Sequence, residues 1–334
     1  MLSTHDVTIR PLGPSGAHDA AFGYRTRKAR RLLIVEQARC TAASPMLRGS
    51  QTLVRRGLQH SSAGRWSALV AGGAAARVSD ASFVEECRAQ YLANGWCHIP
   101  NFIGKERCAE LRNEADALLE SDAAFASTDD HTVYQQERDE RLPLDHPRNR
   151  LMKSTKRIVD YEHVPQESSL RELYSAPELR SFVQAVVGVP ELHLSACPYN
   201  AAMYNGYYDS DGLDWHFDSS EFGVNLVLQN PTDGGKFEYH SLTRSEEDLW
   251  SYDAVTKVLA EADASAEGAA TSAETVEGLA PGSLVFFAGR LSLHRVSPVL
   301  NPDVQSGAVP PDSRGASLRA GARLNAANQR YPHV

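Results

Sequence analysis

The chain has 334 residues, of which 42% are hydrophobic and 23% are charged, so it can bury the core of one large or two small globular domains. It has no run of about 18 apolar residues, which argues against a membrane-spanning helix. Its five cysteines show no C-x-x-C spacing, which argues against structural zinc and a disulfide framework and favours a reducing compartment.

Charge is distributed unevenly along the chain. Of the net charge of −8, residues 1–79 contribute +9, from twelve Lys or Arg and three acids, and the remainder contributes −17. A basic extension rich in Ala, Ser and Arg is typical of a transit peptide or a disordered arm. It lacks the compact apolar core of a secretory signal, and no nucleic-acid recognition motif accompanies it. We therefore expect a cytoplasmic or organellar protein, not a secreted one, without a nucleic-acid or membrane partner.

Periodic patterns predict one domain over residues 80–334, with ordered structure beginning near Val78. A helical pattern ends at Gly95, a short strand covers residues 96–99, and a second helix covers residues 105–119. Helices that precede a sheet in this way commonly brace its outer face, and we expect these two to do so.

The rest of the domain mixes loop, helix and strand patterns. Residues 129–150 are highly charged and contain two prolines, which is typical of a surface loop that can order over an active site. Residues 170–187 predict another supporting helix, and strand patterns follow from Leu192 onwards. Two insertions interrupt these strands. The one near residues 244–280 combines a helical pattern with an acidic tether, either as a lid or as a surface excursion; the other, residues 301–321, is rich in Pro and Gly.

Three residues have the pattern of a metal centre. His216 and Asp218 form a His-x-Asp pair, and His294 follows much later in the chain. Residues i and i+2 of a strand share a face, so the pair can reach one metal ion. Two histidines and one carboxylate form the facial triad that holds Fe(II) and leaves several positions open, whereas catalytic zinc normally leaves one. A hydrogen-bonded structural role is the alternative for each histidine.

The sequence around these residues favours the metal site. Residues 222–229 alternate as a strand does, residues 230–235 form a turn, and residues 236–239 predict a returning strand. Residues 283–288 predict another strand shortly before His294. Both ligand segments therefore lie at strand edges, as a metal site in the mouth of a barrel requires.

Residues 215–222, 233–239 and 289–299 resemble the Fe(II)/2-oxoglutarate dioxygenases, and more narrowly the branch of the free-amino-acid halogenases and related hydroxylases. The resemblance covers most of the predicted domain. It implies an α+β fold with a double-stranded β-helix (jelly-roll, cupin-like) core and supporting N-terminal helices. It also implies an enzyme that uses Fe(II), 2-oxoglutarate and O2, with His216, Asp218 and His294 as catalytic metal ligands.

The resemblance further implies an arginine that binds the C5 carboxylate of 2-oxoglutarate. A guanidinium suits this task because its planar fork matches a carboxylate and stays charged. Arg323 has the matching local sequence, but it lies further after His294 than the family normally places this arginine. We attribute the distance to the insertion over residues 301–321. Arg314 and Arg319 are weaker candidates, and an exposed strand arginine is the alternative for Arg323.

The implied reaction is hydroxylation of a small molecule. Halogenase relatives carry Gly or Ala at the position of Asp218 and bind chloride there, so this carboxylate predicts an alcohol product. The resemblance implies a free amino acid as substrate, including a basic one whose ammonium group needs an acid such as Asp209, Asp214 or Glu221. The alternatives are a hydroxylase of a peptide, protein or larger metabolite, and an inactive cupin-like binding protein.

Overall fold

A computed structural model describes residues 62–195, 197, 199–266, 272–276, 278–300, 319–324 and 326–327. Arg314 and most of the expected insertion over residues 301–321 lie outside these residues, as does most of the expected N-terminal extension. In the described part of the chain, no helix is long and apolar enough to cross a membrane.

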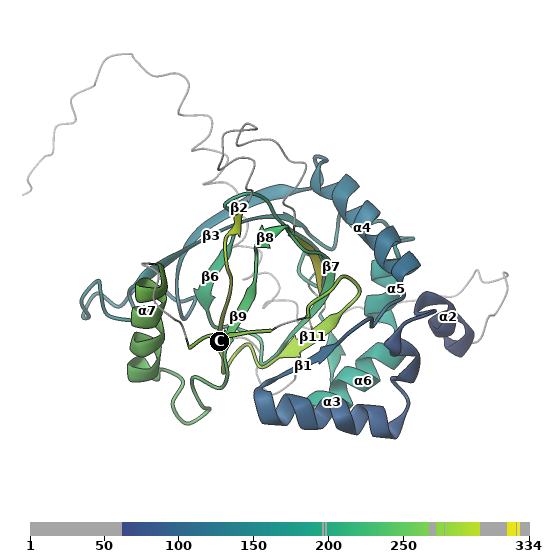
Figure 1. Ribbon diagram of the computed structural model, residues 1–334, viewed down its shortest axis with the longest axis horizontal. Helices are drawn as coiled ribbons and strands as arrows, with labels where there is room; N and C mark the ends of the chain where they lie inside the picture. The colour runs from purple at the N-terminus through teal and green to yellow at the C-terminus, as the bar shows by residue number, and fades with distance from the viewer. Residues whose placement is uncertain are drawn as a thin grey trace, which may run out of the picture. The chain divides into compact units, whose positions relative to one another are not determined.

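Two antiparallel sheets form the core (Figure 1). The larger sheet has the strand order β1-β11-β7-β14-β5-β3-β2, with the strands at Trp96–Ile99, Leu284–Phe287, Gly223–Gln229, Arg319–Leu324, Ala202–Tyr207, Leu151–Val159 and Phe125–Thr132. The smaller sheet has the order β10-β9-β12-β6, with the strands at Glu274–Thr275, Phe237–His240, Leu293–Val296 and Leu213–His216. Two short pairs complete the strands: β8 with β13 (Asp233–Gly234, Val299–Leu300) and β4 with β15 (His193–Leu194, Ala326–Ala327).

The order of these strands along the chain defines the fold. From β5 onwards the strands of four or more residues alternate between the sheets, because β5, β7, β11 and β14 belong to the larger sheet while β6, β9 and β12 belong to the smaller one. This winding is that of a double-stranded β-helix. The predicted α+β class with a jelly-roll core is therefore confirmed.

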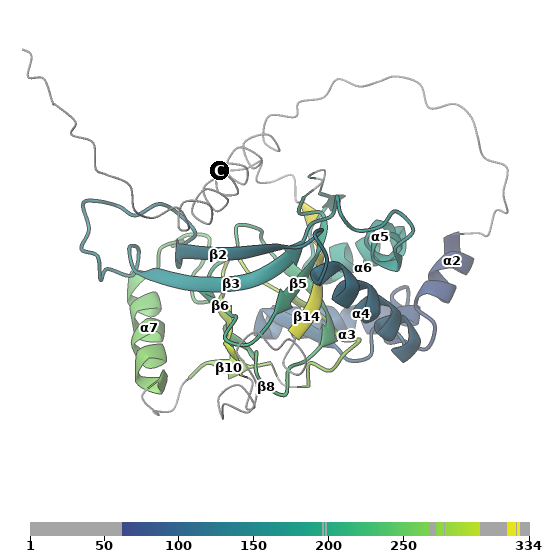
Figure 2. The same cartoon turned by 90° about the horizontal axis from the view of Figure 1, so that it is seen from above.

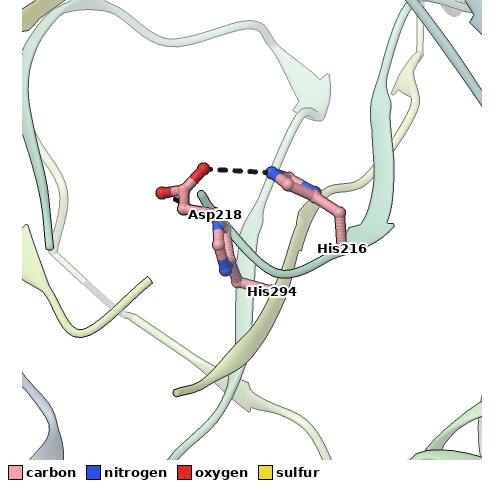
Figure 3. Close-up of side chains that lie close together, drawn as sticks. All are labelled: His216, Asp218 and His294. Atoms are coloured by element: carbon pink, nitrogen blue, oxygen red, sulfur yellow. Dashed lines mark ion pairs between the residues drawn. The ribbon is translucent and has the colours of Figure 1, made fainter. Parts of the chain in front are cut away.

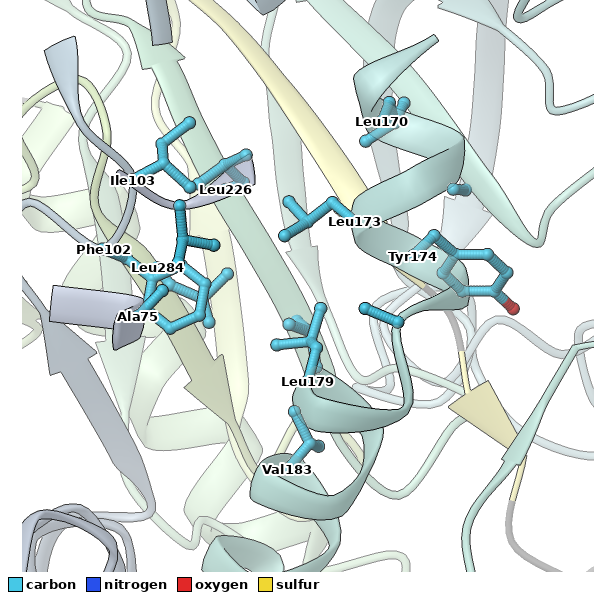
Figure 4. Packing of buried hydrophobic residues seen from close by; sticks show 14 of the residues in the cluster. Ala75, Phe102, Ile103, Leu170, Leu173, Tyr174, Leu179, Val183, Leu226 and Leu284 are labelled. Carbon is cyan, nitrogen blue, oxygen red and sulfur yellow. The ribbon is translucent and has the colours of Figure 1, made fainter. Parts of the chain in front are cut away.

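Helices cover the outer face of the larger sheet. α3 (Ala81–Asn94), α4 (Lys105–Leu119), α5 (Ser169–Ser175) and α6 (Pro177–Val187) contribute to one buried apolar cluster with that sheet. Figure 4 shows Leu173, Leu179 and Val183 of α5 and α6 beside Leu226 and Leu284 of the sheet. The supporting helices expected from the sequence are thus present.

The helix expected over residues 170–187 is two helices. Ala176 separates them in an extended conformation, with φ −63° and ψ 123°. The reason is Pro177, because the ring of a proline disfavours the helical conformation of the residue before it. By contrast, the helix ending at Gly95 is confirmed, since Gly95 takes the left-handed φ of 72° that commonly ends a helix.

Packed structure begins earlier than the residues near Val78 where the sequence pattern suggested it. α2 (Ser62–Leu69) and a 3-10 turn, η1 (Ala74–Arg77), precede α3. Trp66, Leu69 and Val70 are buried in the same cluster as α3 to α6, and the indole of Trp66 donates a hydrogen bond to the carbonyl of Ala75 at 3.2 Å. These residues lie within the segment 1–79 that composition alone grouped with the basic extension.

Regular structure occurs in each of the three segments expected as a surface loop or as insertions. The charged stretch 129–150 begins inside β2, which pairs with β3 along its whole length and runs beside it as a long ribbon (Figure 2). In the insertion near residues 244–280, α7 (Tyr252–Ala266) is a helix, as expected, and Val255, Val258 and Leu259 on it are buried. β14 begins at Arg319, so the end of the second expected insertion belongs to the larger sheet.

A chain that begins at residue 76 is expected to unfold at a lower temperature than one that begins at residue 62. The shorter chain lacks the buried side chains of Trp66, Leu69 and Val70, and each such side chain contributes roughly 1.5–3 kcal/mol when buried. Calorimetric melting of the two chains side by side checks this. Equal melting temperatures would show that residues 62–75 do not stabilise the domain.

Candidate metal centre

His216, Asp218 and His294 come together at one end of the smaller sheet (Figure 3). His216 is the last residue of β6 and lies opposite His294 of β12 in the antiparallel register, which brings the two side chains to one face. The Nε2 atom of His216 lies 3.7 Å from Oδ1 of Asp218, and that of His294 lies 3.6 Å from Oδ2. One nitrogen or oxygen from each residue lies within 4.8 Å of the others.

Main-chain carbonyls set the tautomer of both imidazoles. Nδ1 of His216 lies 2.8 Å from the carbonyl oxygen of Asp214, and Nδ1 of His294 lies 2.9 Å from that of Ser292. A carbonyl oxygen only accepts, so each Nδ1 carries the proton and donates it. The lone pair of each Nε2 is then directed to the side where Asp218 lies, as metal-binding histidines require.

Burial keeps the site in the form that binds a metal. The three side chains are nearly inaccessible, and His216 has a relative accessibility of only 1%. Burial, reinforced by the neighbouring His294, holds the pKa of His216 well below its usual value, so the imidazole is neutral at physiological pH. A buried carboxylate beside this neutral imidazole favours a cation among the three side chains. This donor set fits Fe(II), for which two histidines and one carboxylate are the typical ligands.

The sequence neighbours of the three candidate ligands point to the opposite face of the sheet. Trp215, Phe217 and Leu293 belong to one buried cluster with the apolar side of α7. Side chains of adjacent strand residues point to opposite faces, so α7 covers the outer face of the sheet directly behind the candidate ligands. Within the first insertion, α7 therefore packs against the strands that carry the candidate ligands.

Sequence reasoning missed Arg244, which lies on the ring of Phe217, the residue between His216 and Asp218. Its guanidinium lies 3.8 Å from the centre of the Phe217 ring and donates to the carbonyls of Leu249 and Arg290. Burial, together with the nearby charge of Arg290, lowers the pKa of Arg244 to about 10, so it remains protonated. Arg244 stands in a surface-like run, Ser-Leu-Thr-Arg-Ser, which gave no sign that its side chain makes these contacts.

His131 and Ser154 were also missed. The Ser154 hydroxyl lies 2.7 Å from Nε2 of His131 and accepts a hydrogen bond from the main-chain N–H of Asp214 at 3.0 Å. The Asp214 carbonyl in turn orients His216. The ribbon of β2 and β3 is therefore linked to the candidate ligand His216 through the main chain of Asp214.

Of the acids proposed to bind the substrate, Asp214 lies in β6, and Asp209 and Glu221 lie in the segments that flank it. Asp209, Asp214 and Glu221 are each half-buried. The side chain of Asp214 accepts from the N–H of Trp215 at 2.7 Å. Glu221 lines a small cavity of about 160 Å³ together with Arg290.

The arginine candidates are placed by the register of β14. Arg323 lies opposite Met203 of β5 on one side and Asn225 of β7 on the other. Arg319 lies opposite Tyr207 at the other end of the same pairing. These pairings give the position of each arginine in the sheet.

The jelly-roll core and the His-Asp-His cluster define a class of protein with a candidate metal centre at one end of the smaller sheet. Within this class, residues 78–305 match the family model HalD, Halogenase D. The match covers more than half of the chain, so the protein belongs to the Halogenase D family. This membership confirms the resemblance seen in the sequence, and with it an Fe(II)/2-oxoglutarate-dependent oxygenase. Arg323 lies beyond the matched residues.

Solved structures show a distant likeness. An oxidoreductase of the 2OG-Fe(II) oxygenase family from Burkholderia pseudomallei has 13% identity and a TM-score of 0.45, covering 73% of this chain and 90% of its own. A prolyl-4-hydroxylase from Pseudomonas putida has 12% identity and a TM-score of 0.39, covering 72% and 92%. The α-ketoglutarate-dependent epimerase SnoN from nogalamycin biosynthesis has 13% identity and a TM-score of 0.45, covering 75% and 84%. No curated protein matches the sequence.

The metal-free protein is expected to lose stability as the pH falls below about 6.5. Burial lowers the pKa of His98, His216 and His240. Below the ordinary histidine pKa of about 6.5 the unfolded chain therefore binds more protons than the folded one, and the stability is lost progressively towards the lower, folded-state pKa values. Each histidine contributes up to about 1.4 kcal/mol per pH unit.

Urea unfolding at several pH values between about 5.5 and 7.5 measures this slope. His216→Asn should flatten it, because the amide can keep the hydrogen bond to the Asp214 carbonyl but does not titrate. An unchanged slope in that variant would show that His216 takes up its proton in the folded protein.

Proposed function

We propose that this protein is an Fe(II)- and 2-oxoglutarate-dependent hydroxylase of a small molecule, with His216, Asp218 and His294 holding the iron. The observation that carries the proposal is the buried carboxylate of Asp218, whose oxygens lie 3.7 Å and 3.6 Å from the Nε2 atoms of the two histidines. Membership of the Halogenase D family supports the co-substrate. The carboxylate supports hydroxylation, because it fills the position that chloride takes in halogenases and adds a negative charge that repels a halide.

Each residue of the centre has a separate task. The two imidazoles offer Nε2 lone pairs whose directions are fixed by the carbonyls of Asp214 and Ser292. Asp218 supplies a negative charge that offsets the positive charge of a divalent cation. When bound, iron together with 2-oxoglutarate and O2 supplies the oxidation of an unactivated C–H bond, and 2-oxoglutarate leaves as succinate and CO2. The protein holds the reactants in place and keeps water away from the buried side of the centre.

Arg323 is the residue we propose to bind the C5 carboxylate of 2-oxoglutarate. Gly223 at the start of β7 lies opposite Phe287, whose ring centre is 4.8 Å from that of His294. This end of β7 is therefore the end nearest the candidate ligands, and Arg323 lies opposite Asn225, close to that end. Arg319, the other described candidate, lies about 13 Å further along β14 at the usual rise of a strand, which is too far for a five-carbon acid bound at the metal.

Arg323→Ala is expected to raise the KM for 2-oxoglutarate strongly while the metal affinity stays the same. A carboxylate that loses its charge-assisted partner in a desolvated site loses roughly 2–5 kcal/mol of binding free energy. Steady-state kinetics with varied 2-oxoglutarate measures the effect, and Arg319→Ala is the matched control on the same strand. A normal KM in the first variant and a raised KM in the second would transfer the role to Arg319.

The substrate class we propose is a free amino acid, including a basic one. The family is related to enzymes of free amino acids by the sequence motifs described above, and residues 80–334 carry a net charge of −17, which favours the approach of a cation. Asp209, Asp214 and Glu221 keep partial solvent access, which binding of a substrate ammonium group requires.

The purified protein, incubated with Fe(II), 2-oxoglutarate, O2, chloride and an amino-acid pool, is expected to form succinate and a hydroxylated amino acid, without a chlorinated product. His294→Ala should form neither product, because the metal loses one of three ligands. Mass spectrometry of the pool identifies the product and the substrate together. A chlorinated product from the unmodified protein would contradict both the hydroxylase assignment and the ligand role of Asp218.

The same assay separates the alternatives. Succinate that forms only when peptides replace the amino-acid pool would indicate a hydroxylase of a larger substrate. No succinate with any substrate, in a protein that still binds Fe(II), would indicate a cupin-like binding protein.

A further inference from the structure

Gly289 lies against the carboxylate of Asp218. A side-chain Cβ built at Gly289 would lie 2.3 Å from Oδ2 of Asp218 and 2.9 Å from its Cβ and Cγ, and these are the three nearest atoms. The two residues are also joined through the main chain, because the N–H of Asp218 donates to the carbonyl of Gly289 at 2.9 Å. The carboxylate of Asp218 therefore occupies the space that any side chain at residue 289 would need.

The backbone of Gly289 does not itself require a glycine. Several glycines in the described part of the chain have a positive φ, which other residues rarely adopt, and Gly289 is not one of them. An alanine is therefore compatible with the local conformation. What excludes it is the side chain of Asp218.

The turn around Gly289 is held on both sides, so it cannot move aside easily. The N–H of Ala288 donates to the carbonyl of Gly95 at 2.7 Å. On the other side, the guanidinium of Arg244 donates to the carbonyl of Arg290. The main-chain N–H of Arg244 donates to the carbonyl of Leu291 at 3.0 Å. The same guanidinium lies on the ring of Phe217, the residue before Asp218. Arg244 thus holds together the two segments that meet at the carboxylate.

We propose that Gly289 is a positioning residue whose missing side chain admits the Asp218 carboxylate to the metal centre. The residue sizes at 218 and 289 are therefore coupled: a carboxylate at 218 requires a glycine at 289, whereas a glycine at 218 leaves room for a methyl group at 289. The proposal rests on the proposed ligand role of Asp218. It identifies a determinant of whether the third ligand is present, and this determinant lies on a segment far from Asp218 in the sequence.

Calorimetric titration with Co(II), a divalent ion that is stable in air, tests the coupling in the full chain. Gly289→Ala should weaken Co(II) binding by roughly 10- to 100-fold, the usual effect of disturbing a group that orients a ligand. Asp218→Gly should also weaken it, and adding Gly289→Ala to Asp218→Gly should cause no further loss. Gly206→Ala is the matched control, because its Cβ would meet the side chain of Leu119 at 2.8 Å, away from the metal centre.

Melting of the metal-free variants gives a second readout that does not depend on a metal. Gly289→Ala should lower the melting temperature when residue 218 is Asp and leave it unchanged when residue 218 is Gly. If Gly289→Ala fails to fold while Asp218→Gly with Gly289→Ala folds, the coupling is supported. If both fail to fold, the backbone requires the glycine, and the proposal is overturned.

Equal Co(II) affinity in Gly289→Ala and the unmodified protein would also overturn the proposal. Failure of the proposed function looks different. In that case the unmodified protein binds no Co(II), or His294→Ala binds it equally well, while the melting comparison still reports whether Gly289 makes room for Asp218.

Discussion

The buried carboxylate of Asp218 is the constraint on which the rest of the site depends. Moving a carboxylate out of water costs several kcal/mol unless charge and hydrogen bonds compensate it. Here its neighbours His216 and His294 are turned by carbonyls so that their lone pairs, not their protons, are directed towards it. A compensating cation is thus favoured over internal proton sharing, which supports the proposed metal site over a structural ion pair.

Because side chains alternate between the two faces of a strand, the same short segments serve two purposes. His216 and His294 lie at the metal centre, while their neighbours Trp215, Phe217 and Leu293 pack on the outer face under α7. Because interiors are closely packed, a shift of α7 would move the strands that carry the histidines. α7 therefore supports the candidate metal centre, although it packs on the outer face of the sheet.

Much of the fold and the candidate centre could be predicted from the sequence because their signals are local. The His-x-Asp pair, the alternation around β7 and the helix over residues 105–119 each depend on residues close together in the chain. Arg244 and Ser154 could not be found in this way, because they act through contacts with residues that are distant in the sequence. Trp66 was missed for a different reason: the positive charge of the surrounding segment concealed a short apolar stretch.

The position of Arg323 shows that the fold, and not the spacing in the sequence, determines which residues meet. β14 pairs with β5 and β7 over most of its length. The register of this pairing fixes the position of each β14 residue along the strands of the larger sheet. The connection from β12 can lengthen without changing this register, because the entropy of closing a loop grows only with the logarithm of its length. An arginine separated from His294 by a long connection can therefore occupy the same strand position as one that follows much sooner, and the separation alone does not count against it.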